Sequence, residues 1–296
     1  MAVICSCDVH DKEKLALFIH KRREWKRLLM DSSFHSVYWQ VTHMLWNDAV
    51  FRTFNEGRRL TIERNSPELG LNGPIVRILD EGFVESQVMA IRRLTDRNFR
   101  DPEKAIISLI RLIDDIKAHS NVITRENYIC YDGSSYLEPN TMNDLPNWTH
   151  WMTKQSNFDK MSGILEDKRD RSDKISRSLM KRLEQNLRDC EGPRKYANKF
   201  IAHASDPKTN PELSEDEKKI TLDKLDECYR GIVRTASFLG GVLLYEYFLG
   251  GLPTPQYDHL KNLDKPMVAK VDKKKLHMFW DERSRKVGDW EENLWE

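Results

Sequence analysis

The chain has 296 residues, of which 39% are hydrophobic and 32% are charged. This composition is typical of a globular, helix-rich protein and excludes a disordered or collagen-like chain. Its 48 Lys and Arg residues are balanced by 47 Asp and Glu residues, which leaves a formal net charge of +1. Nucleic acid would therefore have to bind at a local basic patch, because no overall positive field attracts it.

Several classes of protein are disfavoured by what the sequence lacks. The first residues do not form the charged segment and long apolar stretch of a secretory signal, so we expect a cytoplasmic location. The most apolar segment, 236–252, is too short and too rich in glycine to cross a membrane. The five cysteines form no CxxC pair, the nine histidines are scattered, and a phosphate-binding glycine loop is absent. We therefore expect no metal and no cofactor.

Four amphipathic segments in the first 120 residues predict a helical bundle. Along each segment, apolar residues recur at steps of three and four positions. The charged face of the first segment is interpreted as solvated, with RNA or membrane contact as the alternative. The fourth is expected to begin at Asp101-Pro102, a cap residue followed by a first-turn proline. The predicted helices cover 11–30, 34–64, 74–98 and 101–116.

The middle of the chain combines turn signals with renewed helical periodicity. Glycine, proline and asparagine pairs predict a long irregular insertion at 120–157. A helix is expected from Phe158 to Gly192, a residue type that commonly ends helices. A short helix over 193–205 follows.

The last part of the chain is divided into a final core helix and an extension. The capping box from Ser214 to Glu217 is expected to open the final helix of the bundle, which runs to about residue 250. We predict one helical domain, 1–252. Residues 253–296 form a C-terminal extension that either wraps over the bundle or is reserved for a partner protein.

The segment most informative about function is the short helix that ends at His203. Lys199 precedes His203 by about one turn, so the two side chains are expected on one face. An imidazole titrates near neutral pH and can transfer protons, while a lysine can hold a phosphate as a point charge. The alternative is that His203 only caps its own helix end, where a cation is favoured.

Two segments resemble motifs of the HEPN ribonuclease superfamily, in particular of its bacterial abortive-infection proteins. Residues 198–207, NKFIAHASDP, are similar to the family helix in which Arg-Asn/Asp-Lys leads to Ala-His. Residues 85–96, ESQVMAIRRLTD, resemble the RRL-x-D helix of the same group. With the order of the predicted helices, the resemblance covers roughly residues 25–249.

The resemblance implies an all-α HEPN-like bundle, commonly a homodimer whose paired signature helices line a cleft between subunits. Active members are metal-independent ribonucleases. In them the RNA 2′-hydroxyl attacks the adjacent phosphate, a histidine assists proton transfer and an arginine stabilises the charged phosphorane. The catalytic candidates are then His203, Lys199 and Asn198. The candidate contacts to RNA phosphates are Arg92, Arg93, Arg194 and Lys195.

The sequence departs from the family pattern at the arginine. This residue should precede His203 by five to seven positions, which are occupied here by Asn198, Ala197 and Tyr196. Loss of one such transition-state contact typically lowers the rate by about 10²–10³-fold. The signature is therefore degenerate, with Ala197 in place of the family arginine.

Arg92 or Arg93 could supply the missing charge across the cleft. The alternative is that these arginines form ion pairs with Asp96 or Glu85 in their own segment, since arginine is well suited to partly buried pairs. The sequence alone leaves both interpretations open.

Three functions remain. The first is an RNA-directed role in bacterial phage defence or a toxin–antitoxin pair, extending to endoribonuclease activity through His203, with RNA and a second copy of the chain as partners. The second is a catalytically inactive module that binds nucleic acid or, through 253–296, a partner protein. The third, a structural bundle without a site, leaves the two motifs to chance and ranks last. None of the three involves a membrane.

Overall fold

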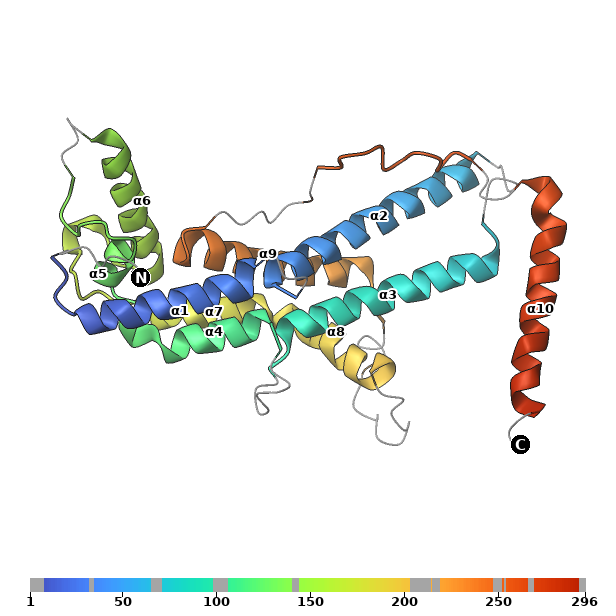
Figure 1. The fold of residues 1–296 in the computed structure, drawn as a ribbon, viewed down its shortest axis with the longest axis horizontal. Helices are drawn as coiled ribbons and strands as arrows, with labels where there is room; N and C mark the ends of the chain where they lie inside the picture. The colour runs from blue at the N-terminus through green and yellow to red at the C-terminus, as the bar shows by residue number, and fades with distance from the viewer. Residues whose placement is uncertain are drawn as a thin grey trace. The chain divides into compact units, whose positions relative to one another are not determined.

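Most of the residues that the computed structural model describes are helical. The described residues are 8–31, 35–64, 71–97, 106–139, 144–202, 214, 219–246, 252, 254–265 and 269–292. Within them, the only β pairing is a single bridge between Thr124 and Lys174. The predicted all-α fold is confirmed (Figure 1).

The helices belong to two compact units. The first contains Met1–Arg52 and Gly73–Pro253, and the second contains Thr53–Asn72 and Thr254–Glu296. The division at residue 252 stays a prediction. No helix in the described ranges is both long enough and apolar enough to cross a bilayer.

Three of the predicted helices are confirmed with small changes at their ends. They are α1 (Lys12–Met30), α2 (Val37–Glu63) and α3 (Gly73–Thr95). Asp11 caps α1 by accepting a hydrogen bond from the amide of Lys14 at 2.9 Å. The apolar stripe of α1 faces the core, where Phe18, Trp25 and Leu29 are almost completely buried.

Helix α4 (Leu109–Ala118) begins later than expected. The hydroxyl oxygen of Ser108 accepts a hydrogen bond from the amide of Arg111 at 3.1 Å, and the hydroxyl donates to the carbonyl of Asp96 at 2.7 Å. Ser108 is therefore the cap. The predicted helix over 101–116 is wrong for 106–108, which are not helical, and its expected start at 101–105 lies outside the described residues.

The segment 120–157, expected to be an irregular insertion, is mostly helical. It contains η3 (Ser120–Val122), α5 (Arg125–Cys130) and most of α6 (Leu145–Ser162). Asp144 caps α6 by accepting a hydrogen bond from the amide of Asn147, and Pro146 lies in the first turn. A proline there lacks only an N–H that would be unpaired anyway, so the residues that suggested a turn start a helix instead.

The single helix predicted from Phe158 to Gly192 is also wrong. Helix α6 ends at Ser162, because Gly163 takes a left-handed conformation with φ of 78° that glycine adopts without strain. The chain continues through η4 (Glu166–Lys168), α7 (Arg177–Asn186) and η5 (Arg188–Cys190). Gly192 does not end a helix, because it lies inside α8 (Glu191–Tyr196).

Two π-helical segments follow the remaining helices of the first unit. Helix α8 continues into η6 (Ala197–Ile201), and α9 (Leu222–Ser237) continues into η8 (Phe238–Leu243). Thr221 caps α9, and 219–221 are not helical. The prediction that Ser214 opens this helix is therefore wrong, and residues 215–218 lie outside the described part.

The second unit contains helix α10 (Lys273–Glu292), preceded by η9 (Lys270–Asp272). The C-terminal extension is thus helical over much of its length (Figure 1). Its large apolar side chains are exposed, with Phe279 and Trp280 retaining 69% and 74% of their accessible surface.

Helix α9 lies very close to the end of α7. A Cβ atom added at Gly231 of α9 would be 1.9 Å from the carbonyl oxygen of Asn186. The absence of a side chain at residue 231 is therefore a condition for this packing.

We predict that Gly231→Ala lowers the free energy of unfolding by about 1–3 kcal/mol, because backbone atoms must move to admit the methyl group. Urea denaturation followed by circular dichroism measures the change. The matched control is Gly82→Ala in α3, where nothing lies within 4 Å of the new methyl group. It should be neutral or stabilise by up to about 1 kcal/mol. Equal effects of the two variants would contradict the packing argument.

Candidate functional site

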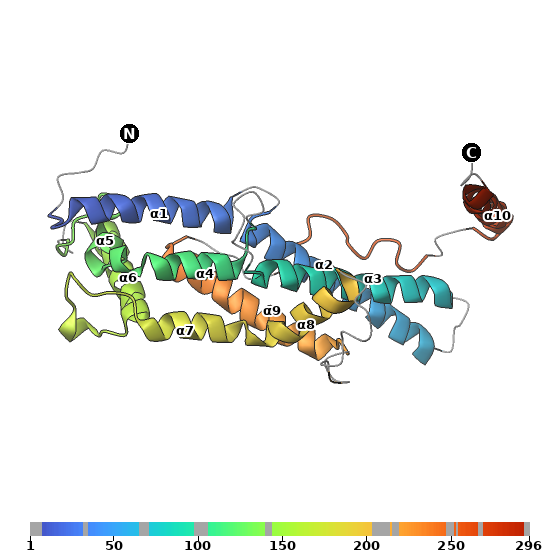
Figure 2. The same ribbon diagram turned by 90° about the horizontal axis from the view of Figure 1, so that it is seen from below.

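The two segments that carry the predicted motifs lie on neighbouring helices. Helix α3 packs against α8 and against η6 within the first unit (Figures 1 and 2). Arg92 and Arg93 are in the last turn of α3, and Arg194 and Lys195 are in the last turn of α8. The fold therefore places the elements that carry all four phosphate-binding candidates next to each other.

The arginines of α3 do not form the ion pairs considered as the alternative. Arg92 is half-buried and Arg93 is exposed. Among the described residues, no ion pair joins either guanidinium to Glu85 or Asp96. Their positive charges are not neutralised within α3.

The cations of α8 differ in their pairing. The ammonium of Lys195 is exposed and lies 3.8 Å from the carboxylate of Glu191, one turn earlier. A solvated pair of this kind is weak. Arg194 is half-buried, and its guanidinium has no ion pair within the described ranges.

The predicted catalytic residues lie in or beyond the π-helical turn. The amide of Ala202 donates to the carbonyl of Ala197 at 2.8 Å, five positions back, which widens the helix. Asn198 is exposed and Lys199 is half-buried in this turn. Single π turns inside α-helices are frequent at functional sites. His203 lies outside the described residues, so its role and its position beside Lys199 stay predictions.

The position that carries the arginine in the family pattern is completely buried here. Ala197 has 0% exposure, in a turn that packs against α3. A guanidinium at this position would lose its contact with water, which costs several kcal/mol unless an acidic partner is present. A charged side chain is therefore disfavoured at residue 197.

A second group of ionisable side chains, which sequence analysis missed, lies where α6 approaches η8. His150 Nε2 is 3.0 Å from Asp132 Oδ2, and His150 Nδ1 is 3.2 Å from the Tyr245 hydroxyl. The fully buried Lys154 donates to the same Asp132 oxygen at 2.6 Å and to the carbonyl of Ile129 at 2.8 Å. The spacing of His150 and Lys154 was a usable signal, because residues four apart share a helix face.

The surroundings shift the pKa values of Asp132 and Tyr131 in opposite directions. Burial by itself would raise the pKa of Asp132, but hydrogen bonds from Lys154 and His150 outweigh it and hold that pKa well below its usual range. Burial raises the pKa of Tyr131 to about 12, and the Lys154 ammonium lies 4.7 Å from the centre of its ring. Burial lowers the pKa of Lys154, although the hydrogen bond and the charge of Asp132 oppose this effect. Because the ammonium donates to Asp132 and to the carbonyl of Ile129, it holds these parts of the fold together.

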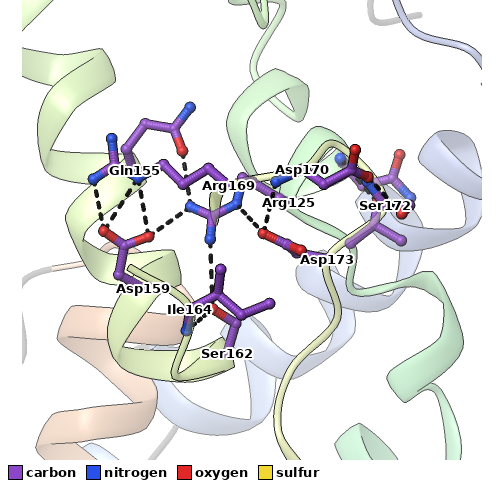
Figure 3. A network of polar contacts seen from close by, with 11 residues as sticks. Arg125, Gln155, Asp159, Ser162, Ile164, Arg169, Asp170, Ser172 and Asp173 are labelled. Atoms are coloured by element: carbon purple, nitrogen blue, oxygen red, sulfur yellow. Dashed lines mark hydrogen bonds and ion pairs between the residues drawn. The ribbon is translucent and has the colours of Figure 1, made fainter. Parts of the chain in front are cut away.

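Figure 3 shows a third polar network, centred on the fully buried Arg125. Its guanidinium donates to Asp159 at 2.7 Å, to Asp173 at 2.8 Å and to the side-chain oxygen of Gln155 at 2.9 Å. Arg169 adds a second guanidinium, 2.6 Å from Asp159. The network connects α5, α6 and the loop before α7, and its charges are used in holding these elements together.

No family model matches the chain, and no curated protein or solved structure matches it. The resemblance to HEPN proteins therefore stays a prediction. Within the described ranges, no group of three or more His, Cys, Asp or Glu side chains is arranged to hold a metal ion.

We predict that Asp132→Asn destabilises the protein most at neutral pH. Because the folded-state pKa of Asp132 is lowered, its carboxylate contributes stability that is fully present above its unfolded pKa of about 4 and is lost as the pH falls below that value. The difference in unfolding free energy between wild type and variant should shrink from pH 7 to pH 3 in urea titrations. A difference that grows on acidification would contradict this account.

Proposed function

We propose that this chain is an RNA-directed protein of the HEPN type, acting through the surface formed by α3, α8 and η6. The observation that carries the proposal is the packing of α3 against α8 and η6. This packing unites the two motif segments, although about one hundred residues separate them in the sequence. A purely structural bundle would not require these two segments to lie in contact.

The charge on these helices supports an RNA phosphate as the ligand. The whole chain has a net charge of only +1, so attraction depends on local cations. The guanidinium groups of Arg92, Arg93 and Arg194 have no ion pair within the described part of the chain. Cations without acidic partners are available to phosphate oxygens, which dominate the affinity of proteins for nucleic acids.

In the proposed reaction, His203 transfers the proton and Lys199 with the nearby arginines stabilises the charge on the phosphate. The 2′-hydroxyl of the RNA attacks the adjacent phosphorus, so no metal is required. We place this activity in bacterial phage defence or a toxin–antitoxin pair, in the cytoplasm and in a homodimer.

A second candidate function is an inactive module that binds RNA or a partner protein. The burial of Ala197 favours it, because the family position for the arginine has no access to a ligand. The exposed aromatic residues of α10 would then serve as a contact surface for a partner protein.

We expect Arg92→Gln and Arg194→Gln each to weaken binding of single-stranded RNA. Each lost phosphate contact should reduce the slope of log affinity against log salt by about 0.7. Filter binding with tRNA and total RNA between 50 and 300 mM salt measures both effects. The control is Arg77→Gln in the same helix α3, because the Arg77 guanidinium is already 2.7 Å from Glu81. No RNA binding by the wild-type protein would refute the proposed function.

Two arginine substitutions distinguish the enzyme from the inactive module. Asn198 is exposed and lies five positions before His203, whereas Ala197 is buried. We expect Asn198→Arg to fold normally and Ala197→Arg to be destabilised. If the protein is a ribonuclease that lacks only the arginine, Asn198→Arg should raise metal-independent cleavage of a reporter RNA by about 10²–10³-fold. Adding His203→Ala to this variant should abolish the cleavage. RNA binding without cleavage in every variant would identify the inactive module.

A further inference from the structure

A pocket of about 340 Å³ lies between α2 and α3 in the first unit. Pockets of this size commonly hold small molecules or single groups of a larger ligand. Its wall combines an aromatic ring, apolar side chains and polar groups. The residues that line it include Trp39, Met44, Gln87, Arg93 and Ile107.

One buried polar side chain of the wall is incompletely paired. Gln87 is 1% exposed, and its Oε1 accepts a hydrogen bond from the Tyr229 hydroxyl at 2.9 Å. The Nε2 of the same amide has no hydrogen-bond partner within the described structure. One hydroxyl can satisfy only one of the two amide atoms, so an unpaired atom remains in either orientation of the amide. An unpaired buried donor is costly, and a polar edge of a ligand would satisfy it.

The aromatic part of the wall is suited to a flat ligand. Trp39 retains 43% of its accessible surface, although it is a large apolar residue. Tyr38 contacts its ring edge to face, with centroids 6.1 Å apart. Met44 and Ile107 add apolar surface to the same pocket. A nucleobase can stack on such a ring while its polar edge reaches an amide.

The charged part of the wall is suited to a single phosphate. The Arg93 guanidinium is exposed and forms no ion pair among the described residues. One guanidinium beside an aromatic ring suits a ligand that carries one phosphate next to a flat polar ring.

We propose that this pocket binds one unpaired nucleotide of a single-stranded RNA. The base lies against Trp39, its polar edge meets the Gln87 amide, and its phosphate meets Arg93. The inference rests on the proposed function for the choice of RNA, and it adds that the RNA is single-stranded. A base held in a duplex cannot enter a pocket, whereas an unstacked base can.

The test compares three probes by fluorescence anisotropy and calorimetry: a single-stranded eight-nucleotide RNA, the same sequence as a duplex, and the mononucleotides AMP and UMP. We expect the single strand to bind more tightly than the duplex. Trp39→Ala should weaken binding of the single strand about 5- to 150-fold, the range expected for loss of one stacked base. Arg93→Gln should also weaken it. The control Trp148→Ala removes a tryptophan of α6 that does not line the pocket, and should leave the affinity unchanged.

The outcomes separate this inference from the proposed function. If Arg92→Gln and Arg194→Gln weaken RNA binding while Trp39→Ala and Arg93→Gln do not, the pocket proposal is overturned and the proposed function stands. If the wild-type protein binds no RNA, the proposed function fails. AMP or UMP binding that is lost in Trp39→Ala would then still identify a nucleotide pocket, and its absence would overturn the pocket as well. Gln87→Met, which keeps the side-chain volume, should weaken binding without loss of the folded signal in circular dichroism.

Discussion

The packing of α3 against α8 and η6 is the contact on which the functional interpretation depends. It leaves Ala197, six positions before His203, completely buried. It also brings Arg92 and Arg194 onto neighbouring helices. The same contact thus accounts both for the burial of residue 197 and for the placement of these two arginines. A charged side chain at residue 197 would disrupt the arrangement that places the other cations.

The charges of this protein fall into two groups with different physical roles. Around Arg125 and Lys154, buried cations are surrounded by carboxylates and carbonyl oxygens, because an unpaired charge in the interior would be strongly unfavourable. On α3 and α8, Arg92, Arg93 and Arg194 lack such partners among the described residues. The first group holds the α5 and α6 region together. The second group has no acidic partner within the described ranges, which is the basis of the proposed RNA surface.

Helix α3 connects the proposed surface to the proposed pocket. Arg92 and Arg93 are adjacent in its last turn, and Arg93 also lines the pocket between α2 and α3. A single strand of RNA offers both features that these residues suit, a regular series of phosphates and bases free to leave the stack. An enzyme and an inactive module would share this mode of binding. They would differ only in what happens at His203.

The sequence by itself determined α1, α2 and α3, because an apolar stripe and a local cap act over a few residues within one segment. It failed where contacts with distant residues decide the local structure, as at Ser108, whose hydroxyl donates to the carbonyl of Asp96, 12 positions earlier. It indicated Arg92 and Arg93 through a resemblance, but not whether they were paired. Only the tertiary structure decided this, and only it revealed the pocket, because the contact between Gln87 and Tyr229 joins residues 142 positions apart. Such a contact depends on how whole helices pack against each other, and no local sequence pattern indicates this.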